Sequence, residues 1–130
     1  IIDCGIRIGQ NLLASHIIPY STGVSIIDNT IKQALGEKIK AEPKWQKNIA
    51  SRLLIFNPGV ISEIKDVREL LDEEGIVDIV LRKHVGDTQK EYIEKSDTCG
   101  WVICEGNTPD EAEKRASLAR KKLRNYFVIN

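Results

Sequence analysis

The segment GWVICEGNTPDEAEKRASLARKKL, residues 100–123, carries the clearest structural signal in this sequence. Its opening residues, GWVIC, form an apolar run that predicts a strand. Thr108 then suits the N-cap of a helix, Pro109 suits its first position, and Glu111 completes a capping box. Further along, small and apolar residues line one face of the predicted helix: Ala112, Ala116, Ala119 and Leu123. The segment therefore predicts a strand, a glycine-containing turn and a capped helix.

On the N-terminal side of this segment, short β-favouring runs are separated by turn signals such as Asn57-Pro58-Gly59. Strands are expected there at residues 1–4, 50–56, 60–64 and 76–81. A last strand is expected after the capped helix, at residues 126–129. Because these strands run together instead of alternating strictly with helices, the fold class is α+β. The sequence thus predicts a mainly antiparallel sheet with flanking helices.

Two helical stretches are expected before the central strands. Residues 12–15 predict a helical turn that stops near Pro19, because the residue before a proline is biased out of the helical region. A second helix is capped by Ser25 or Thr22 and is followed by Gly36, which suits a C-terminal glycine cap. Its apolar residues fall on one face at helical spacing: Ile27, Ile31, Ala34 and Leu35.

The composition excludes several classes of protein. Hydrophobic residues make up 42% and charged residues 29% of the 130 residues, which is ordinary for a globular domain. The 19 basic residues balance the 19 acidic ones, and this zero net charge argues against a nucleic-acid or anionic membrane partner. Apolar runs reach four residues, whereas a membrane-spanning helix needs about 20. We therefore expect no nucleic-acid partner and no membrane partner.

The cysteines and the start of the chain indicate its setting. Cys4, Cys99 and Cys104 are odd in number and show no CxxC spacing, which favours free thiols in a reducing cytosol over a disulfide framework. A single Cys99–Cys104 disulfide stays open. No secretory leader opens the chain, so a cytoplasmic location is expected. Ile1-Ile2-Asp3 resembles the middle of a strand and lacks a methionine, which predicts a piece of a longer chain.

Common enzyme signatures, such as a P-loop, HExxH or GxSxG, are absent. His16 and His84 lack metal-ligand spacing. Asp3 and Arg7 stand out because they flank the end of a predicted strand before a glycine-bearing loop. A carboxylate there can hold Mg²⁺, and an arginine can bind a carboxylate or phosphate. A plain Asp3–Arg7 ion pair is the simpler interpretation of the same residues.

Two groups of motifs resemble the ATP-grasp superfamily. DCGIRIG (3–9), YSTGVSI (20–26) and ALG (34–36) are similar to the end of an ATP-grasp catalytic domain. FNPG (56–59), followed by the strand and helix of 100–123, resembles the C-terminal lobe of biotin carboxylase-like and amino-acid-ligating members. The resemblance implies two regions in one compact unit excised from a longer chain: residues 1–40 end the catalytic domain and residues 41–130 form the C-terminal α+β lobe.

The resemblance implies a C-terminal fragment of an ATP- and Mg²⁺-dependent ligase. Such an enzyme activates a carboxylate as an acyl phosphate for attack by an amine or a similar nucleophile. ATP and Mg²⁺ would act in the parent protein, with neither expected on this fragment alone. The expected partners are the upstream ATP-binding part of the same polypeptide and a small carboxylate substrate, and a homodimer stays open. The fragment by itself is expected to be inactive.

The resemblance also implies site residues. Asp3 becomes a metal ligand and Arg7 a catalytic contact to the transferred phosphoryl group, while Gly9, Gln10 and Asn11 fall in the substrate-binding loop. Two departures weaken the metal site: Gly5 stands where the family has a ligating asparagine, and Asp3 is shorter than the usual glutamate. The metal site is therefore either reduced or completed from elsewhere in the parent.

Two alternatives remain beside the ligase interpretation. The first is a non-catalytic interaction or oligomerisation domain with a degenerate metal site, in which the helix at 108–123 packs on a partner. The second is a free-standing small α+β domain that binds a ligand. The absence of any complete active site in the sequence motivates the first alternative.

Overall fold

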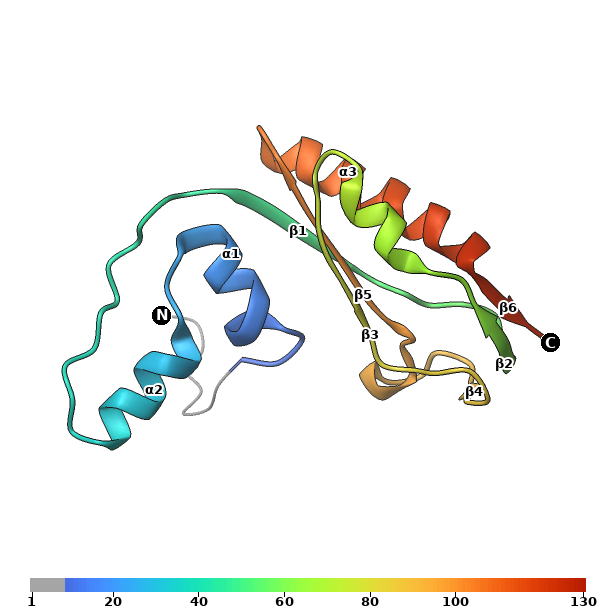
Figure 1. Cartoon of the computed structure of the whole chain (residues 1–130), viewed down its shortest axis with the longest axis horizontal. Helices are drawn as coiled ribbons and strands as arrows, with labels where there is room; N and C mark the ends of the chain where they lie inside the picture. Colours follow the sequence, from blue (N-terminus) through green and yellow to red (C-terminus); the bar gives the residue numbers. More distant parts are fainter. Residues whose placement is uncertain (1–8) are drawn as a thin grey trace. The chain divides into compact units, whose positions relative to one another are not determined.

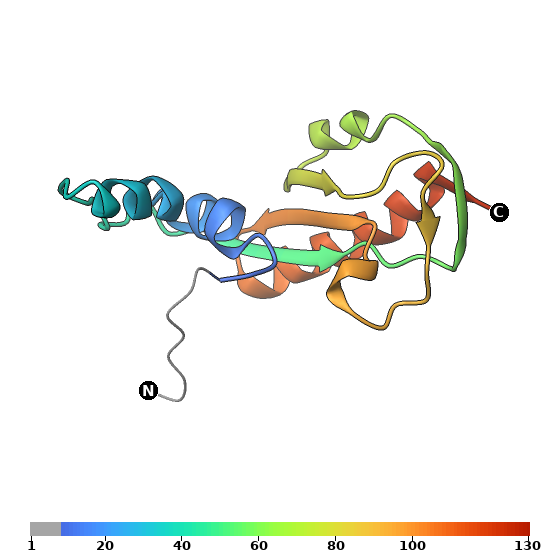
Figure 2. The same ribbon diagram turned by 90° about the horizontal axis from the view of Figure 1, so that it is seen from below.

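The computed structural model describes residues 9–130 of the chain. The strand expected at 1–4, together with Asp3 and Arg7, lies outside these residues. The chain divides into two compact units, which are described separately below. The first ends at Lys47 and is called the N-terminal unit, and the second, Asn48–Asn130, is called the C-terminal unit. The helices of the N-terminal unit and the strands of the C-terminal unit are seen in Figures 1 and 2.

The N-terminal unit is helical. A π-helical turn, Leu13–Ile17, continues directly into α1, Ile18–Thr22, and is followed by α2, Ile26–Ala34. The Ser25 hydroxyl accepts a hydrogen bond from the Asp28 amide at 3.2 Å, so Ser25 is the N-cap of α2, as one of the two predicted candidates. Gly36 follows the end of α2 with φ +73°, which confirms the predicted glycine at this helix end.

The expected helix stop near Pro19 is wrong, because the helical segment continues to Thr22. Pro19 lies in the first turn of α1, where a backbone amide has no intrahelical partner to lose. In the preceding π-helical turn, the Ile17 amide donates a hydrogen bond to the Leu12 carbonyl at 3.0 Å. The chain instead leaves α1 at Gly23, which has φ +74° and donates its amide to the Pro19 carbonyl at 2.8 Å.

The C-terminal unit contains two antiparallel three-stranded sheets. In the first, β5 (Gly100–Gly106) lies between β1 (Asn48–Leu53) and β3 (Ile76–Leu81). In the second, β2 (Gly59–Ile64) lies between β4 (Thr88–Gln89) and β6 (Phe127–Ile129). The strands predicted at 50–56, 60–64, 76–81, 100–104 and 126–129 are confirmed to within a few residues, whereas the two-residue β4 was not predicted. The predicted α+β fold class, with antiparallel strands and flanking helices, is confirmed.

Helix α3, Pro109–Leu123, packs along β5 and β1 (Figure 2). Its predicted apolar face is buried, because Ala112, Ala116, Ala119 and Leu123 are each at most 2% exposed. The small side chains let the helix approach the sheet closely. At Gly106, a Cβ atom would lie 2.4 Å from the Ala112 backbone nitrogen, so the strand end requires glycine. The core beneath α3 is completed by strand and loop residues, including Leu54, Phe56, Ile61, Val102, Cys104 and Phe127.

Cys99 and Cys104 are free, buried thiols, which confirms the thiol interpretation for these two residues. Burial raises the pKa of each thiol to about 11, so both stay protonated at neutral pH. The Cys99 Sγ donates to the Gln89 Oε1 at 2.9 Å, and the Gln89 amide nitrogen donates to the Asp97 carbonyl at 2.7 Å. These thiols therefore belong to the packed core. Within residues 9–130, no helix is both long and apolar enough to span a bilayer.

Candidate functional site

The structure describes three of the sequence-predicted site residues. Gly9, Gln10 and Asn11 are exposed and form a turn that leads into the π-helical segment. The Gln10 carbonyl accepts the Leu13 amide at 3.2 Å, and Asn11 has φ +57°, in the left-handed region that asparagine tolerates. Arg7 lies outside the described residues, as does Asp3. The proposed roles of all five residues therefore remain predictions.

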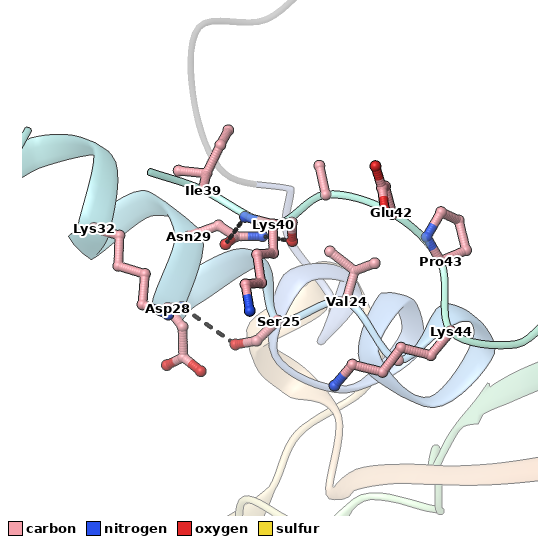
Figure 3. A pocket seen from close by; sticks show the side chains of 12 residues that line it. Val24, Ser25, Asp28, Asn29, Lys32, Ile39, Lys40, Glu42, Pro43 and Lys44 are labelled. Carbon is pink, nitrogen blue, oxygen red and sulfur yellow. Dashed lines mark hydrogen bonds between the residues drawn. The ribbon is translucent and has the colours of Figure 1, made fainter. Parts of the chain in front are cut away.

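A hollow of about 560 Å³ lies between α2 and the connector that follows it (Figure 3). We call it the α2 pocket, and it lies entirely within the N-terminal unit. The residues lining it come from the start of α2 and from the connector: Gly23, Val24, Ser25, Asp28, Asn29, Lys32, Ile39, Lys40, Ala41, Glu42, Pro43 and Lys44. Its volume lies within the roughly 300–1,000 Å³ typical of small-molecule sites.

Hydrogen bonds hold the connector against the helices. The Asn29 side chain makes two bonds to the Lys40 backbone, donating Nδ2 to its carbonyl at 2.6 Å and accepting its amide at 3.1 Å. The Lys44 amide donates to the Thr22 carbonyl at 2.8 Å, and the Trp45 indole nitrogen donates to the Tyr20 carbonyl at 2.9 Å. The two walls of the α2 pocket are therefore tied together at both ends.

The α2 pocket is predominantly cationic. Lys32, Lys40 and Lys44 line it, against the two acidic residues Asp28 and Glu42. Within residues 9–130, none of the three ammonium groups forms an ion pair or a side-chain hydrogen bond. Figure 3 shows the Lys40 and Lys44 side chains directed toward the start of α2, while the Glu42 carboxylate points away from it. This arrangement can bind an anion.

The described residues provide little else for catalysis. No group of three or more histidine, cysteine, aspartate or glutamate side chains within residues 9–130 could hold a metal ion. The charged cluster of the C-terminal unit is structural: Arg115 bonds Glu74 at 2.6 Å and Glu111 at 2.8 Å. The backbone amide of Asn107 donates to Glu111 at 2.7 Å and is the main cause of the lowered pKa of that carboxyl group. This cluster therefore secures the start of α3.

Comparison with known proteins identifies the fold. Phosphoribosylglycinamide synthetase from Anaerococcus prevotii is similar over 95% of this chain and 31% of its own, with 21% identity and a TM-score of 0.74. L-Amino acid ligase from Bacillus licheniformis is similar over 97% of this chain and 31% of its own, with 16% identity and a TM-score of 0.68. The chain thus spans about a third of the length of each. Comparison with curated proteins finds no match.

The fold and the sequence together define a class of protein, the C-terminal part of an ATP-grasp ligase. The family model of L-amino acid ligase C-terminal domain 2 matches residues 52–127, more than half of the chain. The chain belongs to this family. The matched residues cover β5 and α3, the segment from which the sequence analysis started, and the expected resemblance to amino-acid-ligating ATP-grasp proteins is confirmed. The likeness to biotin carboxylase stays a prediction.

Sequence reasoning missed the α2 pocket. The charged connector at 37–47 suggests a solvated face, and its lysines carry no motif of their own. The sequence feature that could have indicated the pocket is a capped helix followed directly by a segment rich in lysine. Only the fold shows that Lys32 lies beside Lys40 and Lys44, because the Asn29 side chain turns the connector back along α2.

Proposed function

We propose that this chain is the C-terminal part of an ATP- and Mg²⁺-dependent ligase that joins a carboxylate to an amine or a similar nucleophile. The single observation that carries the proposal is the match of residues 52–127 to the C-terminal domain of L-amino acid ligases. The fold supports it, because one of the two similar structures is itself an L-amino acid ligase and the other is a synthetase.

In the proposed reaction, a carboxylate oxygen of the substrate attacks the γ-phosphorus of ATP, which releases ADP and leaves an acyl phosphate. The nucleophile then attacks the acyl carbon, and inorganic phosphate leaves. Arg7 would stabilise negative charge on the transferred phosphoryl group, which is the main help that such a transfer needs. Gly9, Gln10 and Asn11 would line the substrate loop.

The described residues do not by themselves fit a magnesium site, because residues 9–130 contain no suitable cluster of ligands. Asp3 remains the proposed ligand of this chain, and Gly5 beside it offers no side chain. The other ligands would come from the upstream ATP-binding part of the same polypeptide.

The upstream part of the polypeptide is also the proposed partner for the apolar face of α2. Ile27, Ile31 and Leu35 lie on this face and are 43%, 55% and 69% exposed. Such a cluster of exposed large aliphatic side chains is typical of an interaction surface. Each similar chain is about three times as long as this one, so a parent of that length contains enough protein to cover the face.

The test compares ADP formation, in the presence of mixed amino acids, by this chain and by the longer protein that its gene encodes. We expect no activity from the chain alone and amino-acid-dependent ADP formation from the longer protein. Arg7→Ala in the longer protein should lower the rate by about a hundredfold or more. Arg124→Ala, on the C-terminal unit, is the matched control and should have no effect. Normal activity of the Arg7→Ala protein would exclude the proposed role of Arg7.

The exposed apolar face of α2 also favours the second candidate, a non-catalytic oligomerisation domain, although the helix expected to pack on the partner, residues 108–123, buries its own apolar face in the core. In that case this face would pair with a second copy of the chain. Sedimentation of the chain should then show a dimer that Ile31→Asp converts to a monomer. A monomer over the whole accessible concentration range would exclude the oligomerisation domain and leave the ligase proposal standing.

A further inference from the structure

The α2 pocket brings three cations together with two acidic residues, so its lining carries an excess of positive charge. Lys32 comes from the second turn of α2, while Lys40 and Lys44 come from the connector. Figure 3 shows Lys40 and Lys44 reaching toward Ser25 from one side, with Lys32 extending beside Asp28. Within residues 9–130, their ammonium groups have no ionic partner. Like charges held in one hollow repel each other, and a bound anion would remove this repulsion.

The acidic residues of the pocket do not cancel this charge. The Glu42 side chain points away from the start of α2 (Figure 3). Asp28 is exposed, and its backbone amide is engaged by the Ser25 hydroxyl at 3.2 Å. With Glu42 directed outward, the three lysines face the single carboxylate of Asp28. The excess of two positive charges matches a doubly charged anion better than a single carboxylate.

We propose that the α2 pocket binds the phosphate group of a small molecule. A phosphate carries close to two negative charges near neutral pH and several acceptor oxygens, which three lysines can neutralise and contact together. Four of the other lining residues are apolar and suit an organic portion: Val24, Ile39, Ala41 and Pro43. The pocket, at about 560 Å³, has room for more than a phosphate group alone.

The walls of the pocket are set before any ligand arrives. The two hydrogen bonds between the Asn29 side chain and the Lys40 backbone fix the connector beside α2. A site whose backbone is already in place loses less conformational entropy on binding. The α2 pocket contains none of the residues assigned to the ligase reaction, so anion binding there and the ligase function are independent of each other.

The test measures binding of pyrophosphate to the chain by calorimetry, at constant ionic strength. We expect saturable binding that Lys40→Gln and Lys44→Gln each weaken by roughly three- to tenfold, as loss of one solvent-exposed charge implies. The triple variant that also carries Lys32→Gln should show no binding. Lys38→Gln is the matched control, because this lysine lies on the same connector but does not line the pocket. Asp28→Asn should strengthen binding about twofold.

Two further ligands identify the source of the phosphate group. Metal-free ATP that binds more tightly than pyrophosphate would indicate a nucleotide, whereas equal affinities would indicate that the phosphate groups alone are recognised. Absence of saturable binding at millimolar pyrophosphate, or binding that the triple variant retains, would overturn the proposal. Circular dichroism of each variant checks that the helices remain folded. None of these outcomes bears on the match of residues 52–127, on which the ligase proposal rests.

Discussion

The two units of this chain bury their apolar residues very differently. In the C-terminal unit, α3 and both sheets enclose a continuous core, with Leu54, Ile61 and Leu123 at 0% exposure. In the described part of the N-terminal unit, the buried hydrophobic residues are Ala14 and Val24, while the large residues of α2 remain exposed. Apolar residues at helical spacing therefore do not by themselves show that a helix packs against a core. The C-terminal unit has a core of its own, whereas the described part of the N-terminal unit buries few apolar residues.

The largest expected difference in the free energy of unfolding is between variants of two isoleucines. Ile61→Ala removes a fully buried side chain from the C-terminal core and should lower the free energy of unfolding by about 2–5 kcal/mol. Ile31→Ala removes a side chain that is 55% exposed on α2 and should change it by about 0.5 kcal/mol or less. Urea denaturation measures both. Equal losses would show that the face of α2 is buried in the folded chain.

A second prediction concerns the contact between β5 and α3. Gly106→Ala would place a Cβ 2.4 Å from the Ala112 nitrogen, and relief of this clash with backbone should lower stability by about 1–3 kcal/mol. At Gly86 an added Cβ meets nothing within 4 Å, although φ is +95°. Gly86→Ala should therefore cost only about 1 kcal/mol of backbone strain. Urea denaturation of the two variants tests the ranking, and an equal loss would contradict the clash.

The helix caps give a smaller and more local comparison. The hydroxyl of Thr108 accepts the Glu111 amide at 3.2 Å, and Ser25 makes the same bond to Asp28 in α2. Thr108→Ala should lower the global stability by about 1 kcal/mol, because α3 unfolds with the core. Ser25→Ala should instead increase amide hydrogen exchange in α2 alone. Equal global losses would mean that α2 is coupled to the core.

The smallest expected effect depends on pH. The Asn107 amide, with a smaller contribution from Arg115, lowers the pKa of Glu111 in the folded state. A carboxyl group with a lowered folded-state pKa contributes stability above its unfolded pKa and loses it as the pH falls through the folded value. Glu111→Gln should therefore lower the melting temperature at about pH 7, and the difference should shrink toward about pH 3. A difference independent of pH would exclude an electrostatic origin.

Local signals were sufficient to predict most elements. The capping residues of α3, the β-favouring run of β5 and the Ser25 cap act within a few residues of the chain, so the sequence shows them directly. The Pro19 prediction was wrong because a proline can either end a helix or occupy its first turn, and the choice depends on the preceding π-helical turn. The two-residue strand β4 was missed, since its pairing with β2 has no local signature.

The amino-acid sequence alone was enough to predict the α+β class, the capped helix α3 and the resemblance to ATP-grasp ligases, because each depends on residues adjacent along the chain. Tertiary structure was needed to place β5 between β1 and β3, to bury the face of α3 and to leave the face of α2 exposed. It also brought Lys32 beside Lys40 and Lys44. The physical reason is that burial and charge clustering depend on which distant segments meet, and periodicity along one helix is identical whether its apolar face is covered or open to solvent.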